Sequence, residues 1–494
     1  MSKEITSREK DYSQWYNDLI IKGGLADYSA VRGCMVIKPY GYAIWENMRD
    51  ELDKMFKETG HENAYFPLFV PKSLFEAEEK NAEGFAKECA IVTHYRLKAD
   101  PDNKGKLMVD PEAKLEEELV VRPTSEAIIW NTYKGWIQSY RDLPLLINQW
   151  ANVVRWEMRT RLFLRTSEFL WQEGHTAHAS ESEAQDETLQ MLGIYEDFAR
   201  NEAAIPVIPG QKSEQEKFPG ALRTYTIEAM MGDKRALQSG TSHNLGQNFA
   251  KTFDIKYTDR NNELQHCWTT SWGLSTRFIG SIIMAHGDDQ GLRMPPRLAP
   301  IQVIIVPIFK NETEQSQVLA SAHLMRELLK TAGVRVKIDL REGLAPGFKY
   351  NDWEMRGVPI RLEIGPKDLQ NNTVALARRD ITGKAGKQFV ARDSAVQMVL
   401  NLLSDIHVNM LQQATAFRDA NIHMVEGDYE KFKEIVVDAW AYTWFCGRAE
   451  CEAKIKEDNQ LVSRCFPLKQ EPGSGPCIVC GDLSDRRAYF AKAY

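Results

Sequence analysis

The chain has 494 residues, of which 43% are hydrophobic and 27% charged, and its formal net charge at pH 7 is -7. This length exceeds one ordinary domain, so two to four domains are expected. The acidic balance excludes a global basic field, so a nucleic-acid partner would have to meet local patches.

The sequence also bears on where the protein works. The N-terminal MSKEITSREKDYSQWY has mixed charge and no apolar core, so we expect no secretory signal. No run approaches the roughly 18 apolar residues of a membrane span. We therefore expect a cytoplasmic protein without membrane contact. Its eight cysteines would be buried, metal-binding or reactive rather than paired in disulfides.

Residues 1–285 combine helical patterns with short alternating runs. The run AIWENMRDELDKMFKETG predicts a helix that ends at Gly60. Residues 98–119 contain several Asp, Pro and Gly, which predicts a surface insertion.

In VVRPTSEAIIWNTYKGW, Pro123 and Thr124 predict the start of a helix. Glu126 in the first turn suits the helix dipole, and this structural role would be sufficient for it. The functional alternative is that Thr124 and Glu126 project into a cleft and hold a substrate ammonium.

The run VVRWEMRTRLFLRTSEFLW predicts an antiparallel hairpin. Its strands would cover 153–157 and 165–171, with a loop at 158–164 that carries Arg159 and Arg161. Alternation would then expose on one sheet surface two guanidiniums, a carboxylate and an aromatic ring, from Arg155, Arg165, Glu157 and Phe169.

Such a surface suits a nucleotide, because guanidiniums bind phosphate and a ring can stack on a base. The alternative is a half-exposed hairpin with surface ion pairs. No glycine-rich dinucleotide loop or G-x-x-x-x-G-K-[ST] phosphate loop occurs in the sequence.

Residues 271–287, SWGLSTRFIGSIIMAHG, predict a helix after Gly273 whose apolar positions include Leu274 and Phe278. Arg277 in its first turn opposes the helix dipole, so a bound anion would explain it. The alternative is an exposed arginine.

Residues 286–300 have the breakers of a linker, and a strand–helix rhythm follows. Strands are predicted in IQVIIVPIF, VRVKIDL, PIRLEIG and NTVALARRD, and helices in SQVLASAHLMRELLKTAG, FKYNDWEMRGV and AVQMVLNLLSDIHVNMLQQA. This alternation predicts a compact α/β domain.

The C-terminal region carries two close cysteine pairs, Cys446-x4-Cys451 and Cys477-x2-Cys480. Four thiolates with such spacing predict a closed, structural zinc site. The alternative is four buried thiols. Cys34, Cys89, Cys267 and Cys465 lack this pairing.

Together these patterns resemble class II aminoacyl-tRNA synthetases. The R-x-E and R-x-x-x-F runs at 153–173 look like motif 2, and the arginine-bearing helix start at 271–287 looks like motif 3. GHENAYFPLF, near 60–67, is similar to motif 1, and RPTSE to the T-x-E loop of subclass IIa. GLADYSAVRGCMVIKPYGYAIWE and GTSHNLGQNF further resemble prolyl-tRNA synthetases of the archaeal/eukaryotic-like type, found also in some bacteria.

The resemblance covers nearly the whole chain and implies an α/β (α+β) protein of three parts. These are a class II antiparallel-sheet catalytic domain at 1–285, a linker and α/β anticodon-binding domain at 286–404, and a small zinc-binding α/β module at 405–494. The stretch 98–119 is longer than the family leads us to expect. A homodimer is implied by motif 1.

The resemblance also implies site residues. Arg155 and Arg277 would be catalytic, and ATP, with Mg²⁺, would bind to Arg155, Glu157, Arg165, Phe169, Gln238 and Arg277. L-Proline would bind to Thr124, Glu126, Arg155, Trp171, Glu173, His175, Phe218, Thr241 and His243.

Further implied residues lie outside the catalytic centre. Glu354, Arg361, Lys367 and Asp368 are expected to read the anticodon of tRNA(Pro), and the alternative is an amphipathic surface strand. The C-terminal carboxylate of Tyr494 is expected near the active site.

A pocket for a small apolar ring rejects one methylene by only about 1–3 kcal/mol, so alanine and cysteine should also be activated. The 100 residues between Glu173 and Gly273 are too few for the editing insertion of bacterial-type relatives, so no editing in cis is expected.

Three alternatives remain. A synthetase for another small amino acid would share these motifs. A non-catalytic RNA-binding paralogue would usually lose motif residues, which are all present here. A zinc-ribbon DNA binder is disfavoured because the acidic chain has no strong phosphate footprint, so no DNA partner is expected.

Overall fold

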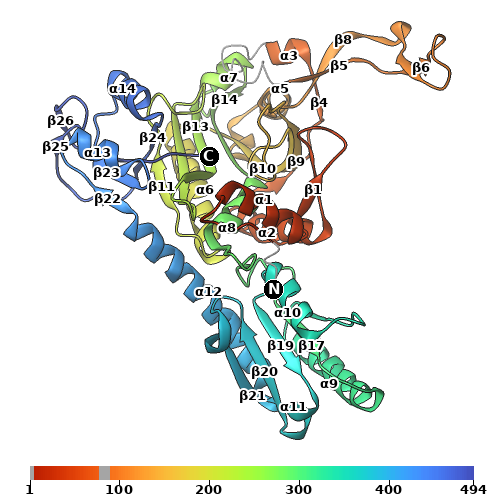
Figure 1. Cartoon of the computed structure of the whole chain (residues 1–494). Helices are drawn as coiled ribbons and strands as arrows, with labels where there is room; N and C mark the ends of the chain where they lie inside the picture. The colour runs from red at the N-terminus through yellow and green to blue at the C-terminus, as the bar shows by residue number, and fades with distance from the viewer. Residues whose placement is uncertain (1–4, 77–88) are drawn as a thin grey trace.

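An eleven-stranded sheet runs through the centre of the structure (Figure 1), a computed structural model that describes residues 5–76 and 89–494. Neighbouring strands are antiparallel except at two places, where β22 pairs with β23 and β3 with β9. In sheet order the strands are β22 (Ile422–Met424), β23 (Trp440–Trp444), β27 (Arg487–Phe490), β24 (Ser463–Pro467), β11 (Ile208–Gln211), β12 (Arg223–Met230), β13 (Ala236–Gly246), β16 (Trp268–Ser275), β10 (Glu168–His178), β9 (Leu145–Val154) and β3 (Glu62–Asn63).

The main hydrophobic core joins this sheet chiefly to the helices α1 (Tyr12–Lys22), α2 (Pro39–Glu58), α6 (Glu181–Asn201) and α8 (Arg277–His286). Helix α2 ends as predicted, and Gly60 follows it with φ +88°. The ring of Trp272 on β16 packs so closely on β10 that a Cβ at Gly174 would lie 2.0 Å from it. Any larger residue at Gly174 would therefore displace a core tryptophan.

Smaller elements surround this body. They are β1 (Ala26–Tyr28), β2 (Met35–Ile37), β4 (Phe69–Pro71), α3 (Lys72–Glu76), β5 (Ala90–His94), α5 (Glu126–Trp136), α7 (Asn248–Thr252), β14 (Lys256–Thr258) and β15 (Leu264–His266). The predicted surface insertion forms the hairpin of β6 (Leu97–Ala99) and β7 (Leu107–Val109) and most of β8 (Lys114–Val121). Figure 1 shows this hairpin extending away from the body.

The predicted α/β unit after residue 300 is confirmed. Its five-stranded sheet has the order β18-β17-β19-β20-β21, with β17 parallel to both of its neighbours. Strand β21, helix α11 and the continuation of α12 to Ala420 were not predicted. The elements are β17 (Val303–Pro307), α9 (Glu312–Thr331), β18 (Val336–Ile338), α10 (Pro346–Met355), β19 (Ile360–Ile364), α11 (Pro366–Gln370), β20 (Thr373–Arg378), β21 (Lys387–Ala391) and α12 (Ala395–Ala420).

The C-terminal region adds α13 (Tyr429–Ile435), α14 (Ala449–Asn459), β25 (Gly475–Pro476) and β26 (Leu483–Ser484) to four strands of the central sheet. These strands do not form a sheet of their own, because β24 pairs with β11 at Gly210 and Gln211. Buried Glu228 on β12 accepts a hydrogen bond across this seam from Arg464 on β24 at 2.8 Å, and another from Lys212, next to β11, at 2.9 Å. In the described parts of the chain, no helix has the length and apolar character needed to cross a bilayer.

Candidate active site

Two cavities, of about 300 and about 270 Å³, have linings that share Arg155. The first is lined by all the residues expected to bind proline, by Gln238, and also by Glu216, Lys217, Pro219, Thr224, Ser271, Trp272 and Gly273. The second is lined by Arg155, Glu157, Phe163, Leu164, Arg165, Thr166, Phe169, Ser275 and Arg277. The predicted ATP residues thus come together, except that Gln238 lies in the first cavity.

Strand alternation and register explain how the first cavity is built. Along β10, Gln172 faces helix α6 and donates to Asn148, whereas the neighbouring Glu173 and His175 line the cavity. Cross-strand pairing then aligns two rows of residues. One row is Glu173, Gly273, Thr241 and Thr226, and the other is His175, Ser271, His243 and Thr224.

Glu173 is buried at the floor of the first cavity. It accepts hydrogen bonds from Ser125, from Gln149 at 2.8 Å and from His175 Nε2 at 3.0 Å. Burial alone would raise the pKa of this carboxyl, but the hydrogen bonds outweigh burial and leave the pKa below its usual value. Burial likewise opposes a charge on His175, but Glu173 raises its pKa. The two side chains therefore form a buried ion pair.

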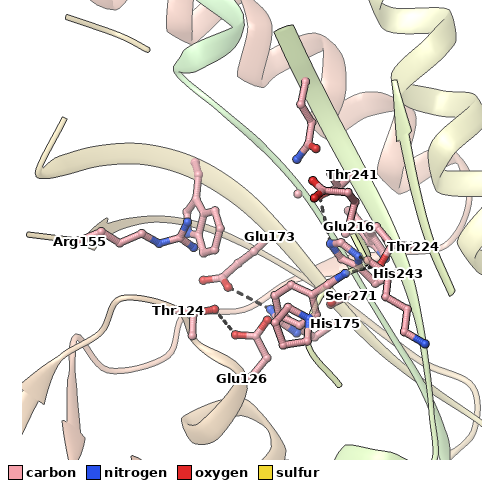
Figure 2. A pocket seen from close by; sticks show the side chains of 17 residues that line it. Thr124, Glu126, Arg155, Glu173, His175, Glu216, Thr224, Thr241, His243 and Ser271 are labelled. Carbon is pink, nitrogen blue, oxygen red and sulfur yellow. Dashed lines mark hydrogen bonds and ion pairs between the residues drawn. The ribbon is translucent and has the colours of Figure 1, made fainter. Parts of the chain in front are cut away.

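Glu126 supplies a second buried carboxylate from the first residue of α5. Among the described residues its hydrogen bond is to the hydroxyl of Thr124, as Figure 2 shows. The charge of His175 interacts with Glu126, but the hydrogen bond of His175 goes to Glu173. Among the described residues Glu126 therefore has no hydrogen-bonded cation of its own, and a buried carboxylate in this position favours a cationic ligand. His243 is no such cation, because burial and the charge of His175 lower its pKa to about 3.

The second cavity lies at the turn between β9 and β10. The predicted hairpin is confirmed, with Val154 opposite Glu168. However, β9 ends earlier and β10 begins later than predicted, so the connection runs from Arg155 to Ser167 rather than over 158–164 alone. Leu274 was expected in the helix after Gly273 but lies on β16, and α8 begins at Arg277. Arg155 therefore directly follows β9, Arg165 lies within the connection, and Arg277 is the first residue of α8.

Three guanidiniums line the second cavity with one carboxylate. Glu157 lies 3.8 Å from the Nε of Arg165. Burial, followed by repulsion from Arg165 and Arg155, lowers the pKa of Arg277 to about 10. Even with this lowered pKa, Arg277 still carries a positive charge at neutral pH. This excess of positive charge favours a polyanion such as a triphosphate.

The other two arginines of the connection lie apart from the second cavity. Arg159 is exposed. Arg161 lies in the connection, as expected, and its guanidinium contacts the rings of Tyr16 and Tyr494. Tyr494 donates its hydroxyl to Asp233 at 2.5 Å.

The structure brings together two of the four residues expected to read the anticodon. Arg361 on β19 donates to Glu354 at 2.6 Å and stacks 4.0 Å from the ring centre of Tyr350. Both charged residues line a cavity of about 280 Å³ that also includes Arg378, Arg379, Lys384 and Lys387. Lys367 and Asp368 are outside this lining, in α11, where Asp368 accepts from the backbone N–H of Gly365 at 2.8 Å.

The four predicted cysteines come together in the C-terminal region, with all sulfur atoms within 4.8 Å of one another. Cys446 Sγ lies 3.5 Å from Cys451 Sγ and from Cys477 Sγ, and 4.0 Å from Cys480 Sγ. Tetrahedral zinc with Zn–S bonds of about 2.3 Å requires sulfurs roughly 3.8 Å apart, so the donor set fits zinc. Gly447 and Gly481, each next to a cysteine, have φ +77° and permit the tight turns.

Comparison with known proteins gives three matches in chain order. Residues 108–286 match the model "tRNA synthetase class II core domain (G, H, P, S and T)", 302–402 match "Anticodon binding domain", and 429–494 match "Prolyl-tRNA synthetase, C-terminal". Proline–tRNA ligase of Flavobacterium johnsoniae is 58% identical over 100% of both chains. The proteins of that name from Flavobacterium psychrophilum and Porphyromonas gingivalis are 59% and 55% identical, over 100% of this chain and 100% and 99% of theirs. The chain belongs to the proline–tRNA ligase family.

In this member of the proline–tRNA ligase family, sequence reasoning missed several residues of the first cavity. Thr224 and Ser271 stand opposite His243 on the two neighbouring strands, and Glu216 and Lys217 come from the loop before β12. Strand alternation could have placed Thr224 on the same face as Thr226. The order of the strands in the sheet, which brings both to His243, has no local sequence signal.

Proposed function

We propose that this member of the family activates L-proline with ATP and then transfers the prolyl group to the 3′ end of tRNA(Pro). The observation that carries the proposal is that Arg155 is shared by two cavities of different chemistry. One cavity holds buried carboxylates beside aromatic rings, and the other holds three arginines. An enzyme that joins a small zwitterion to a triphosphate needs these two sites side by side.

In the first cavity, Glu126 and Thr124 would bind the secondary ammonium of proline, and Arg155 its carboxylate. Rings and histidines would enclose the pyrrolidine ring. The side chains of Glu173 and His175 would hold each other in place at the base of this cavity, since each neutralises the charge of the other. The residues proposed to bind proline are Thr124, Glu126, Arg155, Trp171, Glu173, His175, Phe218, Thr241 and His243.

In the second cavity, Arg155 would contact the α-phosphate of ATP, and Arg165 and Arg277 the outer phosphates. Phe169 would stack on adenine, while Glu157, together with Gln238 from the first cavity, would lie on the nucleoside side. ATP would enter with Mg²⁺, for which phosphate oxygens are the preferred ligands.

The reaction then needs positioning and charge stabilisation rather than a protein nucleophile. A carboxylate oxygen of proline attacks the α-phosphorus, the bond from this phosphorus to the bridging oxygen breaks, and pyrophosphate leaves. A terminal ribose hydroxyl of tRNA next attacks the carbonyl carbon of the adenylate, an ester forms and AMP leaves. Arg155 stabilises charge at the α-phosphate in the first step. We assign no general base to the protein.

Discrimination would remain imperfect, with alanine and cysteine also activated, because small apolar side chains differ too little in binding free energy. We propose no editing in cis. The chain between β10 and β16 folds as α6, α7 and strands that build or border the central sheet. Purified protein should therefore not hydrolyse alanyl-tRNA(Pro) above the rate in buffer; hydrolysis clearly above that rate would contradict the proposal.

We propose the domain division 1–285, 286–404 and 405–494, with the anticodon guanines read beside Glu354 and Arg361. The basic lining of that cavity supports contact with RNA. The four C-terminal cysteines would hold a structural Zn²⁺. Given substrates of this kind, we propose a cytoplasmic location.

A homodimer through the helix and strand of motif 1, α2 and β3, is also proposed. Exposed aromatic side chains near this element support it, since Tyr65 and Phe69 are 71% and 45% exposed. Sedimentation equilibrium would detect the dimer as twice the chain mass, and a monomer at all concentrations would contradict it.

Aminoacylation tests the proposed function. Purified protein with ATP, Mg²⁺ and tRNA(Pro) should form prolyl-tRNA with proline and release AMP. A tRNA whose anticodon guanines are replaced should be charged much less well. Charging that does not depend on proline would contradict the proposal.

A further inference from the structure

Arg161 is held by rings rather than by hydrogen bonds. Its guanidinium carbon lies 4.7 Å from the ring centre of Tyr16 and 5.1 Å from that of Tyr494. Its Nε and Nη2 are buried and have no hydrogen-bond partner among the described residues. Two aromatic rings thus contact the guanidinium, and these cation–π contacts are the principal attachment of the side chain.

The two rings are themselves fixed by distant parts of the chain. Tyr16 is fully buried in α1 and donates its hydroxyl to the carbonyl oxygen of Leu162 at 2.8 Å. Tyr494 donates its hydroxyl to Asp233 and its backbone N–H to the carbonyl oxygen of Ala236 at 3.1 Å. Helix α1, through Tyr16, and Tyr494 thus both contact the side chain of Arg161.

The backbone of Arg161 is paired directly with Arg165, which lines the second cavity. The N–H of Arg161 donates to the carbonyl oxygen of Arg165 at 2.6 Å, and the N–H of Arg165 donates back at 2.8 Å. Between them, 162–164 are buried in the main core. The carbonyl oxygen of Leu164 accepts from Nε of Arg277 at 3.1 Å. One closed turn therefore holds two of the three arginines of the second cavity.

We infer that Arg161 is a positioning residue. Clamped between Tyr16 and Tyr494, it fixes the turn 161–165 and thereby the guanidiniums of Arg165 and Arg277 for the outer phosphates of ATP. The inference rests on the proposed function of the second cavity. It gives the C-terminal residue a role in ATP binding, although its ring lies beyond the lining of that cavity.

If the contacts of Arg161 with Tyr16 and Tyr494 position the turn, their loss should weaken the binding of ATP and leave the binding of proline nearly unchanged. Arg161→Met and Tyr494→Ala should each raise the KM for ATP in proline-dependent pyrophosphate exchange by about ten-fold, the range expected for a buried cation–π contact. The KM for proline should change less than about two-fold, because none of residues 161–165 lines the first cavity. Calorimetric titration with ATP alone should show the same weakening.

Two further variants separate the clamp from general loss of packing. Arg161→Lys keeps the cation and should recover part of the ATP affinity. Arg486→Met removes an exposed arginine that stacks 4.3 Å from the ring centre of Phe466 in the same C-terminal region, and it should keep the wild-type KM for ATP.

A double-mutant cycle tests the contact itself. Because both changes break one contact, Arg161→Met with Tyr494→Ala should be no worse than the more affected single variant. Additive effects, equal rises in both KM values, or unchanged ATP affinity would overturn the inference. If Arg161→Met fails to fold, Tyr494→Ala decides alone. Absence of exchange in the wild-type protein would instead refute the proposed function.

Discussion

The Nε–H of Arg155 donates to the carbonyl oxygen of Pro123 at 2.9 Å. Pro123 directly precedes Thr124, so this bond ties the arginine shared by both cavities to the wall of the first. The guanidinium also lies 5.4 Å from the ring centre of Trp171 and 5.5 Å from that of Phe169. Arg155 is thus held in place before either substrate binds, which is the arrangement expected where two substrates must meet at one phosphorus.

Glu126→Gln should raise the KM for proline with little change in the KM for ATP. The amide keeps the shape of the side chain but loses the negative charge that pairs with the substrate ammonium. A charge-assisted hydrogen bond is worth about 2 kcal/mol, or roughly thirty-fold in KM. Exchange kinetics at varied proline would measure it, with Glu181→Gln on the exposed start of α6 as the control. A rise in the KM for ATP alone would contradict the assignment.

His243 should make the free energy of unfolding depend on pH. Burial and nearby His175 lower its pKa to about 3 in the folded state, whereas an unfolded histidine has a pKa near 6.5. The unfolded chain therefore binds more protons between these values, so stability present above about pH 6.5 is lost as the pH falls. From about pH 7 to about pH 5.5 the loss should be about 1 kcal/mol.

Urea unfolding of the wild type and of His243→Gln at these two pH values measures this contribution. The variant should lose about 1 kcal/mol less than the wild type on acidification. His423→Gln, at an exposed histidine, should retain the wild-type dependence. Identical pH dependence of the free energy of unfolding in all three proteins would mean that folding does not lower the pKa of His243, and it would contradict the prediction.

The cysteine cluster should bind one zinc ion per chain. Elemental analysis of the purified protein should find it, and Cys477→Ser should lose it together with part of the thermal stability, because a structural zinc site contributes to folding. Cys34→Ser, at a cysteine outside the cluster, should keep the metal. Full stability after complete removal of zinc by a chelator would contradict a structural role.

Arg361→Ala should lower kcat/KM for tRNA(Pro) by about 5- to 150-fold, since a good arginine–base contact is worth about 1–3 kcal/mol. The loss should far exceed any change in pyrophosphate exchange, because tRNA is absent from that assay. Lys330→Ala, at an exposed lysine of α9, is the matched control in aminoacylation. Equal losses in both variants would mean that Arg361 acts only through general charge.

Local sequence signals predicted elements better than they predicted their assembly. Glycines and prolines located the end of α2 and the start of α5, and alternation located β10. The lengths of β9 and β10 were misjudged, because Arg155 to Ser167 retains an extended pattern although Leu162–Leu164 turn into the core. The seam between β11 and β24 and the stacking of Arg161 on Tyr494 join residues remote in sequence, so no local pattern could reveal them.

The most direct test of the account is ATP–pyrophosphate exchange with a panel of amino acids, repeated with Arg155→Ala. We predict exchange that depends chiefly on proline, with weaker exchange on alanine and cysteine. In Arg155→Ala the rate of proline-dependent exchange should fall by at least about a hundred-fold, which is the effect of removing a charge-stabilising donor. The variant should remain folded. Exchange driven mainly by another amino acid, or undiminished in Arg155→Ala, would contradict the account.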